Sequence, residues 1–98
     1  MTDLTADHAK PHRLPQVLDL VQARQLRDDM ISLVALGAVT LDAGDVERLS
    51  TPSLQVLLAA ARAAESAGFE FRIVNASEPF QAALCDLGLQ TAFKNWMN

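Results

Sequence analysis

Hydrophobic positions change their spacing along the chain, and each change predicts a change of secondary structure. Between residues 20 and 36, apolar side chains recur at every third or fourth position, which is typical of an amphipathic helix. They are Ala23, Leu26, Met30, Leu33 and Val34. Gly37 follows, and a residue that adopts a positive φ easily favours the end of a helix. Residues 20–36 are therefore predicted to form a helix.

Shorter runs of apolar or alternating residues predict strands. We expect strands at residues 14–19, 38–42 and 69–74, because runs of this length and alternation suit a sheet. Pro15 makes the first of them an edge or irregular strand, since proline cannot donate a hydrogen bond to a neighbour. Residues 46–49 predict one more extended segment, directly before the next helix.

A second, more apolar helix is predicted at residues 52–67. Leucine and alanine recur there at helical spacing, and Pro52 stands near the start. Proline fits the first helical position, because its missing N–H is no loss there. This assignment makes Thr51 the N-cap, the residue whose hydroxyl accepts a hydrogen bond from the first turn.

The remaining residues predict a third helix and a short terminal turn. The third helix begins beside Pro79 and ends at Gly88, and the terminal turn carries Phe93 and Trp96. We expect these two aromatic residues to fold back over the core rather than to form an anchor for a partner. Helices that alternate with strands imply parallel pairing through right-handed crossovers. The predicted fold class is therefore α/β, a small sandwich with a central, mostly parallel β-sheet covered by helices.

The length and polarity of the chain predict one domain with an N-terminal tail. The chain has 98 residues, half of them apolar, which suffices for one small core and not for two. Residues 1–13 are polar, lack periodicity and contain Pro11. We predict a flexible tail there, as is common at chain ends, and a folded domain at residues 14–98.

The charge and the apolar runs argue against nucleic-acid or membrane partners. The net charge is −4 without a lysine or arginine cluster, which disfavours binding to polyanions. The longest apolar run, residues 56–61, is too short for direct membrane insertion. Cys85 is the single cysteine, so an internal disulfide is excluded and a reducing, cytoplasmic location is favoured. Its apolar surroundings in the sequence predict a buried side chain.

The sequence assembles neither a catalytic site nor a metal site. His8 and His12 have the spacing of a helical metal pair, but they lie in the polar tail with Pro11 between them. Carboxylates gather at residues 42–47; a solvated acidic loop is favoured there over metal binding or acid–base chemistry. The four glycines are isolated and form no phosphate loop. We therefore predict a binding protein rather than an enzyme, with no metal and no cofactor.

The order of these motifs resembles that of STAS domains. The similarity lies in residues 39–42, in Leu49-Ser50-Thr51-Pro52-Ser53-Leu54, in the helix that follows, and in residues 84–89. It covers roughly residues 14–89. STAS domains are found in sulphate-transporter tails and in anti-sigma factor antagonists, so the resemblance implies a stand-alone STAS protein of the antagonist-like type.

The resemblance implies a role for Thr51. Regulatory STAS domains carry a hydrophobic residue, Asp, Ser or Thr, a small residue, Gly and Leu at this turn, and a partner kinase phosphorylates the Ser or Thr. Thr51 falls at the phosphoacceptor position. Ser50 replaces the acid and Ser53 replaces the glycine. Pro52 compensates in part, because its φ is preset for a helix start.

We expect a protein partner to dock on the turn and on the exposed ridge of the following helix. The candidate partner-binding residues are Ser50, Thr51, Ser53, Gln55, Val56 and Arg62. The implied function is a signalling protein that binds an anti-sigma factor kinase or a histidine kinase and is released when Thr51 is phosphorylated. The alternative is a structural accessory subunit of a lipid-transport ATPase complex without a phosphoswitch. Nucleotide binding ranks last, since one helix N-terminus is the only phosphate cradle.

Overall fold

The computed structural model describes residues 11–97 and confirms the α/β fold class. Ten elements follow one another along these residues. In chain order they are β1 (His12–Arg13), β2 (Val17–Leu18), α2 (Leu20–Leu36), β3 (Val39–Asp42), β4 (Arg48–Leu49), α3 (Thr51–Ser66), β5 (Phe71–Val74), α4 (Glu78–Asp86), α5 (Gln90–Phe93) and η1 (Lys94–Trp96). The bounds of α2 are those predicted from the apolar spacing.

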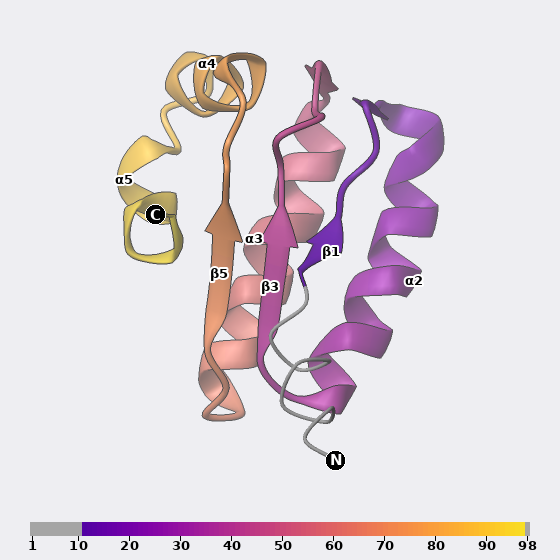
Figure 1. The fold of residues 1–98 in the computed structure, drawn as a ribbon, viewed down its shortest axis with the longest axis vertical. Helices are drawn as coiled ribbons and strands as arrows, with labels where there is room; N and C mark the ends of the chain where they lie inside the picture. Colours follow the sequence, from indigo (N-terminus) through magenta and orange to yellow (C-terminus); the bar gives the residue numbers. More distant parts are fainter. Residues whose placement is uncertain (1–10, 98) are drawn as a thin grey trace.

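The strands form two parallel sheets. Strands β1, β3 and β5 lie side by side in this order (Figure 1), and all of their pairings are parallel. Strands β2 and β4 pair with each other, also in parallel, as a separate short ribbon. The predicted mostly parallel sheet is therefore confirmed, although the extended segment before α3 joins the second sheet and not the central one.

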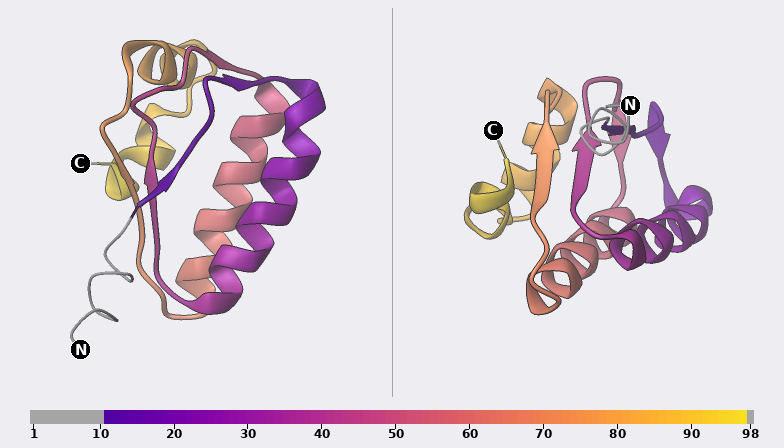
Figure 2. Two further views of the ribbon diagram at one scale, coloured as in Figure 1. Left: turned by 45° about the vertical axis from the view of Figure 1, so that its right-hand side comes forward. Right: turned by 60° about the horizontal axis from the view of Figure 1, so that its bottom comes forward.

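Both long helices lie on one side of the β1–β3–β5 sheet (Figure 2) and begin near the carboxyl ends of its strands. Strand β3 alternates in burial, with Val39 and Leu41 buried and Thr40 and Asp42 only partly covered. This period of two is what a strand with one covered face produces. The core lies between that face and the helices, where Leu57 is fully buried.

The C-terminal segment packs beside β5. Met97 forms a parallel bridge with Ile73, and α5 lies next to the β5 edge of the sheet (Figure 1). The Trp96 ring makes edge-on contacts with Phe71 and Phe93, with ring centroids 6.1 and 5.3 Å apart. The prediction that the terminal aromatic residues fold back over the core is confirmed.

The N-terminal boundary is a correction. His12 and Arg13 pair with Leu41 and Asp42 of β3, so two residues assigned to the flexible tail belong to the sheet. The predicted strand at residues 14–19 is reduced to Val17–Leu18, with Leu14 fully buried before it. Strands of two residues are too short to produce a detectable alternation of apolar and polar positions in the sequence. Residues 1–10 of the predicted tail lie outside the described residues.

Candidate partner-binding site

The N-termini of α2 and α3 are held side by side by the β2–β4 ribbon. The Ser50 backbone N–H donates to the Leu18 carbonyl at 2.9 Å. The next residue, Asp19, caps α2 and accepts from the backbone N–H groups of Val21 and Gln22 at 3.0 and 3.2 Å. Because parallel strands end at the same edge, the helices that follow them begin together. The turn singled out by sequence therefore faces a second helix start.

Ser50, and not Thr51, is the N-cap of α3. Its backbone is extended, with φ −84° and ψ 160°, and its Oγ accepts from the Ser53 N–H at 3.3 Å. Thr51 is the first helical residue and Pro52 the second. The second position tolerates proline as well, because its N–H also lacks a partner within the helix. Both assignments made from the sequence were therefore one residue out.

Ser53 is fully buried, which corrects its assignment to the exposed ridge. Its hydroxyl donates to the Asp19 carbonyl at 3.3 Å and accepts from the Ser50 hydroxyl at 3.2 Å. These bonds link the starts of α2 and α3 and satisfy a buried polar group that would otherwise be costly. Ser53 cannot contact a partner directly in this structure. The signal missed in the sequence is its spacing to buried Leu57, Ala60 and Ala64.

Thr51 lies at the exposed start of α3. Among the hydrogen bonds of residues 11–97, none involves its hydroxyl, in contrast to those of Ser50 and Ser53. Gln55 follows one turn later and is exposed, and Arg62 is exposed farther along the helix. The spacing of four and seven residues places Thr51, Gln55 and Arg62 along one side of α3.

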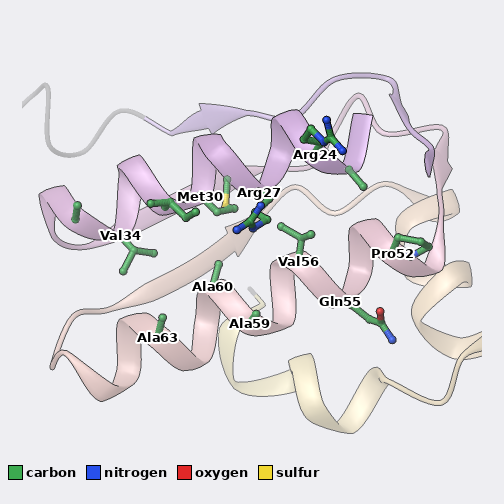
Figure 3. A pocket seen from close by; sticks show the side chains of 13 residues that line it. Arg24, Arg27, Met30, Val34, Pro52, Gln55, Val56, Ala59, Ala60 and Ala63 are labelled. Carbon is green, nitrogen blue, oxygen red and sulfur yellow. The ribbon is translucent and has the colours of Figure 1, made fainter. Parts of the chain in front are cut away.

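An apolar groove runs between α2 and α3 (Figure 3). It encloses about 780 Å³ and begins beside Pro52 and Gln55, close to the start of α3. Half-buried Val56 lies in its wall. The groove is therefore continuous with the exposed turn.

The acidic loop at residues 42–47 is held by a hydrogen bond within it and by contacts with residues outside it. The Asp42 carboxylate accepts from the Gly44 N–H at 2.9 Å, and the Glu47 carboxylate accepts from the Gln16 side chain at 3.2 Å. Asp45 lies 3.7 Å from the Arg13 guanidinium in an exposed pair. Residues 11–97 contain no cluster of three histidine, cysteine or acidic side chains that could hold a metal ion. His8, one of the two histidines considered as ligands, lies outside them.

Cys85 is exposed, contrary to the prediction of a buried side chain. Its neighbour Leu84 is buried with Phe80 on the inner face of α4. Adjacent residues on a helix do not share a face, so the apolar sequence around Cys85 was a poor guide.

In the same residues 11–97, none of the helices has the length and apolarity needed to cross a bilayer.

A family model described as "Mlab, STAS domain" matches residues 5–94. The chain belongs to the STAS domain family. None of the curated proteins compared with it matches. The match covers the β2–β4 ribbon, both long helices and the turn between Leu49 and Leu54. It confirms the family suggested by the order of motifs.

Membership of the STAS family supports a general regulatory or binding role for this chain. STAS domains generally interact with other proteins, and the family is generally non-catalytic. In this STAS domain the cap position holds Ser50 where the regulatory pattern has an acid, and a serine caps a helix about as well as an acid does. The departure from the pattern therefore leaves the geometry of the turn intact.

Proposed function

We propose that this STAS domain is a non-catalytic regulatory protein whose partner docks on the exposed start of α3 and is released by phosphorylation of Thr51. The observation that carries the proposal is the difference between three neighbouring hydroxyls. Ser50 and Ser53 are engaged in hydrogen bonds that cap and join the helices, whereas Thr51 is exposed at the first helical position. Thr51 is the hydroxyl that a kinase reaches most easily.

The proposed switch breaks a contact and leaves the domain folded. A phosphate adds about −1.5 to −2 charges, and the unpaired N–H groups at a helix N-terminus favour negative charge. A partner surface packed over Thr51 has no room for the phosphate and loses contact with it. Kinases that bind STAS domains, either anti-sigma factor kinases or signalling histidine kinases, are the partners proposed. A cytoplasmic location is part of this proposal.

The remaining candidate residues extend the proposed docking surface along α3. Gln55 and Arg62 are exposed on the side of the helix that carries Thr51, and half-buried Val56 adds apolar contact area. Ser50 contributes by fixing the start of α3, and Ser53 by fixing α3 against α2. Their part in binding is to position Thr51.

The test is capture of the partner from the producing cells on tagged wild-type, Thr51→Ala and Thr51→Glu protein. We expect Thr51→Ala to retain the partner and Thr51→Glu to lose it, because the carboxylate carries part of the charge of a phosphate. Thr91→Glu is a matched control, since Thr91 is also exposed in the first turn of a helix, α5. Equal capture by both Thr51 variants rules out the switch.

A second candidate is a static accessory subunit of a lipid-transport ATPase complex. It is favoured by Ser50, which takes the place of the acid beside the acceptor in regulatory STAS domains and caps α3 without one. In this case Thr51 makes a permanent contact and is never modified. Constant co-purification with an ATPase subunit, with no phosphate adduct in the intact mass, distinguishes it from the first candidate.

A further inference from the structure

The charged side chains that line the groove between α2 and α3 are all positive, and they lie toward the start of α2. They are Arg24 and Arg27, one turn apart on α2, in a chain whose net charge is −4. The ion pairs found within residues 11–97 join Arg13 to Asp45 and Arg72 to Glu70, so neither groove arginine takes part in one. Two exposed guanidinium groups are therefore available to carboxylates from outside.

The opposite end of the groove is apolar. Val34 from α2 faces Ala59 and Ala63 from α3 (Figure 3). Ile31, three residues before Val34 on α2, also lines the groove and is 57% exposed. Small side chains on α3 let a neighbouring backbone approach closely, as interlocking of two helices requires. The groove therefore has a positive end toward the start of α3, which carries Arg24 and extends to Arg27, and an apolar end beside Ala63.

An α-helix suits this groove better than an extended segment does. The walls are side chains of two helices whose backbone groups are already paired internally, so they offer no ladder to an added strand. An extended backbone would leave its own polar groups unpaired against apolar walls, whereas a helix satisfies them itself. The lining spans twelve positions on α3, from Pro52 to Ala63, which is roughly 18 Å or three helical turns.

We propose that the groove binds an amphipathic helix of the partner protein, with apolar residues along one stripe and two carboxylates one turn apart that face Arg24 and Arg27. The inference rests on the proposed function, because it names the chemistry of the partner that docks there. A second copy of this chain fits less well, since the groove would bring only positive charges to a surface shared by two identical copies.

The positive end of the groove lies at the same end of α3 as Thr51. Pro52 and Gln55 line the groove, and Thr51 directly precedes Pro52. A phosphate on Thr51 therefore stands near the carboxylates of the bound helix and repels them, while offering the arginines an alternative partner. The groove accordingly explains why charge at Thr51 releases the partner instead of only blocking it.

The test uses purified full-length protein and a designed probe, and it does not need the natural partner. The probe is a fluorescent, covalently stapled helix of three to four turns with a leucine stripe and two glutamates one turn apart; in the matched probe, lysines replace the glutamates. Fluorescence anisotropy measures binding. We expect the acidic probe to bind at least about tenfold more tightly than the basic one, and its affinity to fall with salt.

Charge-reversed variants test whether the preference for the acidic probe arises from the two arginines of the groove. Arg24→Glu with Arg27→Glu is expected to weaken the acidic probe by at least about tenfold and to favour the basic one. The control pair, Arg72→Glu with Lys94→Glu, changes the net charge equally at exposed positions outside the groove. Circular dichroism verifies that each variant is folded. We also expect the methyl signals of Ile31, Val34 and Val56 to shift on binding.

Three results overturn the inference. They are equal binding of both probes, equal effects of the two charge-reversed pairs, and self-association of the chain that the groove variant abolishes, which assigns the groove to a second copy. A failure here together with Thr51-dependent capture of the natural partner rejects the acidic helix and leaves the proposed function standing. If the probe binds as expected but capture of the partner does not depend on Thr51, the phosphoswitch is rejected, and the assignment of the groove to an acidic helix stands.

Discussion

At the scale of single residues, three hydroxyl side chains within four positions have separate roles. Ser50 caps α3, Ser53 ties α3 to α2 through the Asp19 carbonyl, and Thr51 stands exposed between them. The sequence identified the turn but not this division, because capping depends on backbone angles that neighbouring serine and threonine adopt equally well. Ser53 lies four residues before buried Leu57 and therefore shares its face of the helix. This spacing indicates burial, but serine is usually exposed, and Ser53 was therefore predicted to be on the exposed ridge.

Replacing Ser50 by alanine is predicted to destabilise the domain more than replacing Thr51. Ser50→Ala removes the cap of α3 and should lower the free energy of unfolding by about 1 kcal/mol. Thr51→Ala removes an exposed hydroxyl without a partner in the described hydrogen bonds, so its effect should lie within about 0.5 kcal/mol. Urea unfolding of both variants measures the difference. An equal loss of unfolding free energy in Thr51→Ala would contradict the assignment of the cap to Ser50 alone.

The single cysteine offers a second test at this scale. Because Cys85 is exposed on α4, a water-soluble disulfide reagent should modify one thiol in the folded protein without denaturant. Spectrophotometric counting of released thiolate measures this. Modification that appears only after denaturation would mean that Cys85 is buried.

At the scale of elements, periodicity predicted the helices well and the short strands poorly. The bounds of α2 followed from apolar spacing, because a helix of 17 residues repeats its pattern several times. Strands β1, β2 and β4 have two residues each, which is too short for any period to show. Their pairing depends on the rest of the fold, which the local sequence does not contain.

The C-terminal turn is predicted to contribute strongly to stability. The Trp96 indole N–H donates to the Glu65 carboxylate at 2.8 Å, and its ring packs on Phe71 and Phe93. Trp96→Phe keeps a ring but loses the hydrogen bond, at a cost of about 1 kcal/mol. Trp96→Ala also loses the packing and should cost about 3–5 kcal/mol. Urea unfolding followed by far-UV circular dichroism checks the order. A near-neutral Trp96→Ala would mean that this turn does not pack on β5.

At the scale of the whole molecule, the fold presents its helices to one side. Both α2 and α3 lie on the same face of the sheet (Figure 2), and their N-termini meet at the end of the β2–β4 ribbon. The groove between the helices opens next to Thr51 through Pro52. Helix pairing of this kind follows from the alternation of strands and helices, but the groove depends on side-chain sizes across two helices and could not be predicted from either one.

The central claim is that the exposed start of α3 is where a protein partner binds and is released. The most direct measurement is the affinity of the captured partner for purified wild-type, Thr51→Ala, Thr51→Glu and Thr91→Glu protein at one salt concentration. We predict that Thr51→Glu binds at least about tenfold more weakly than the wild type, while Thr51→Ala and Thr91→Glu stay within about twofold. Unchanged affinity of Thr51→Glu, or an equal loss in Thr91→Glu, would contradict the account.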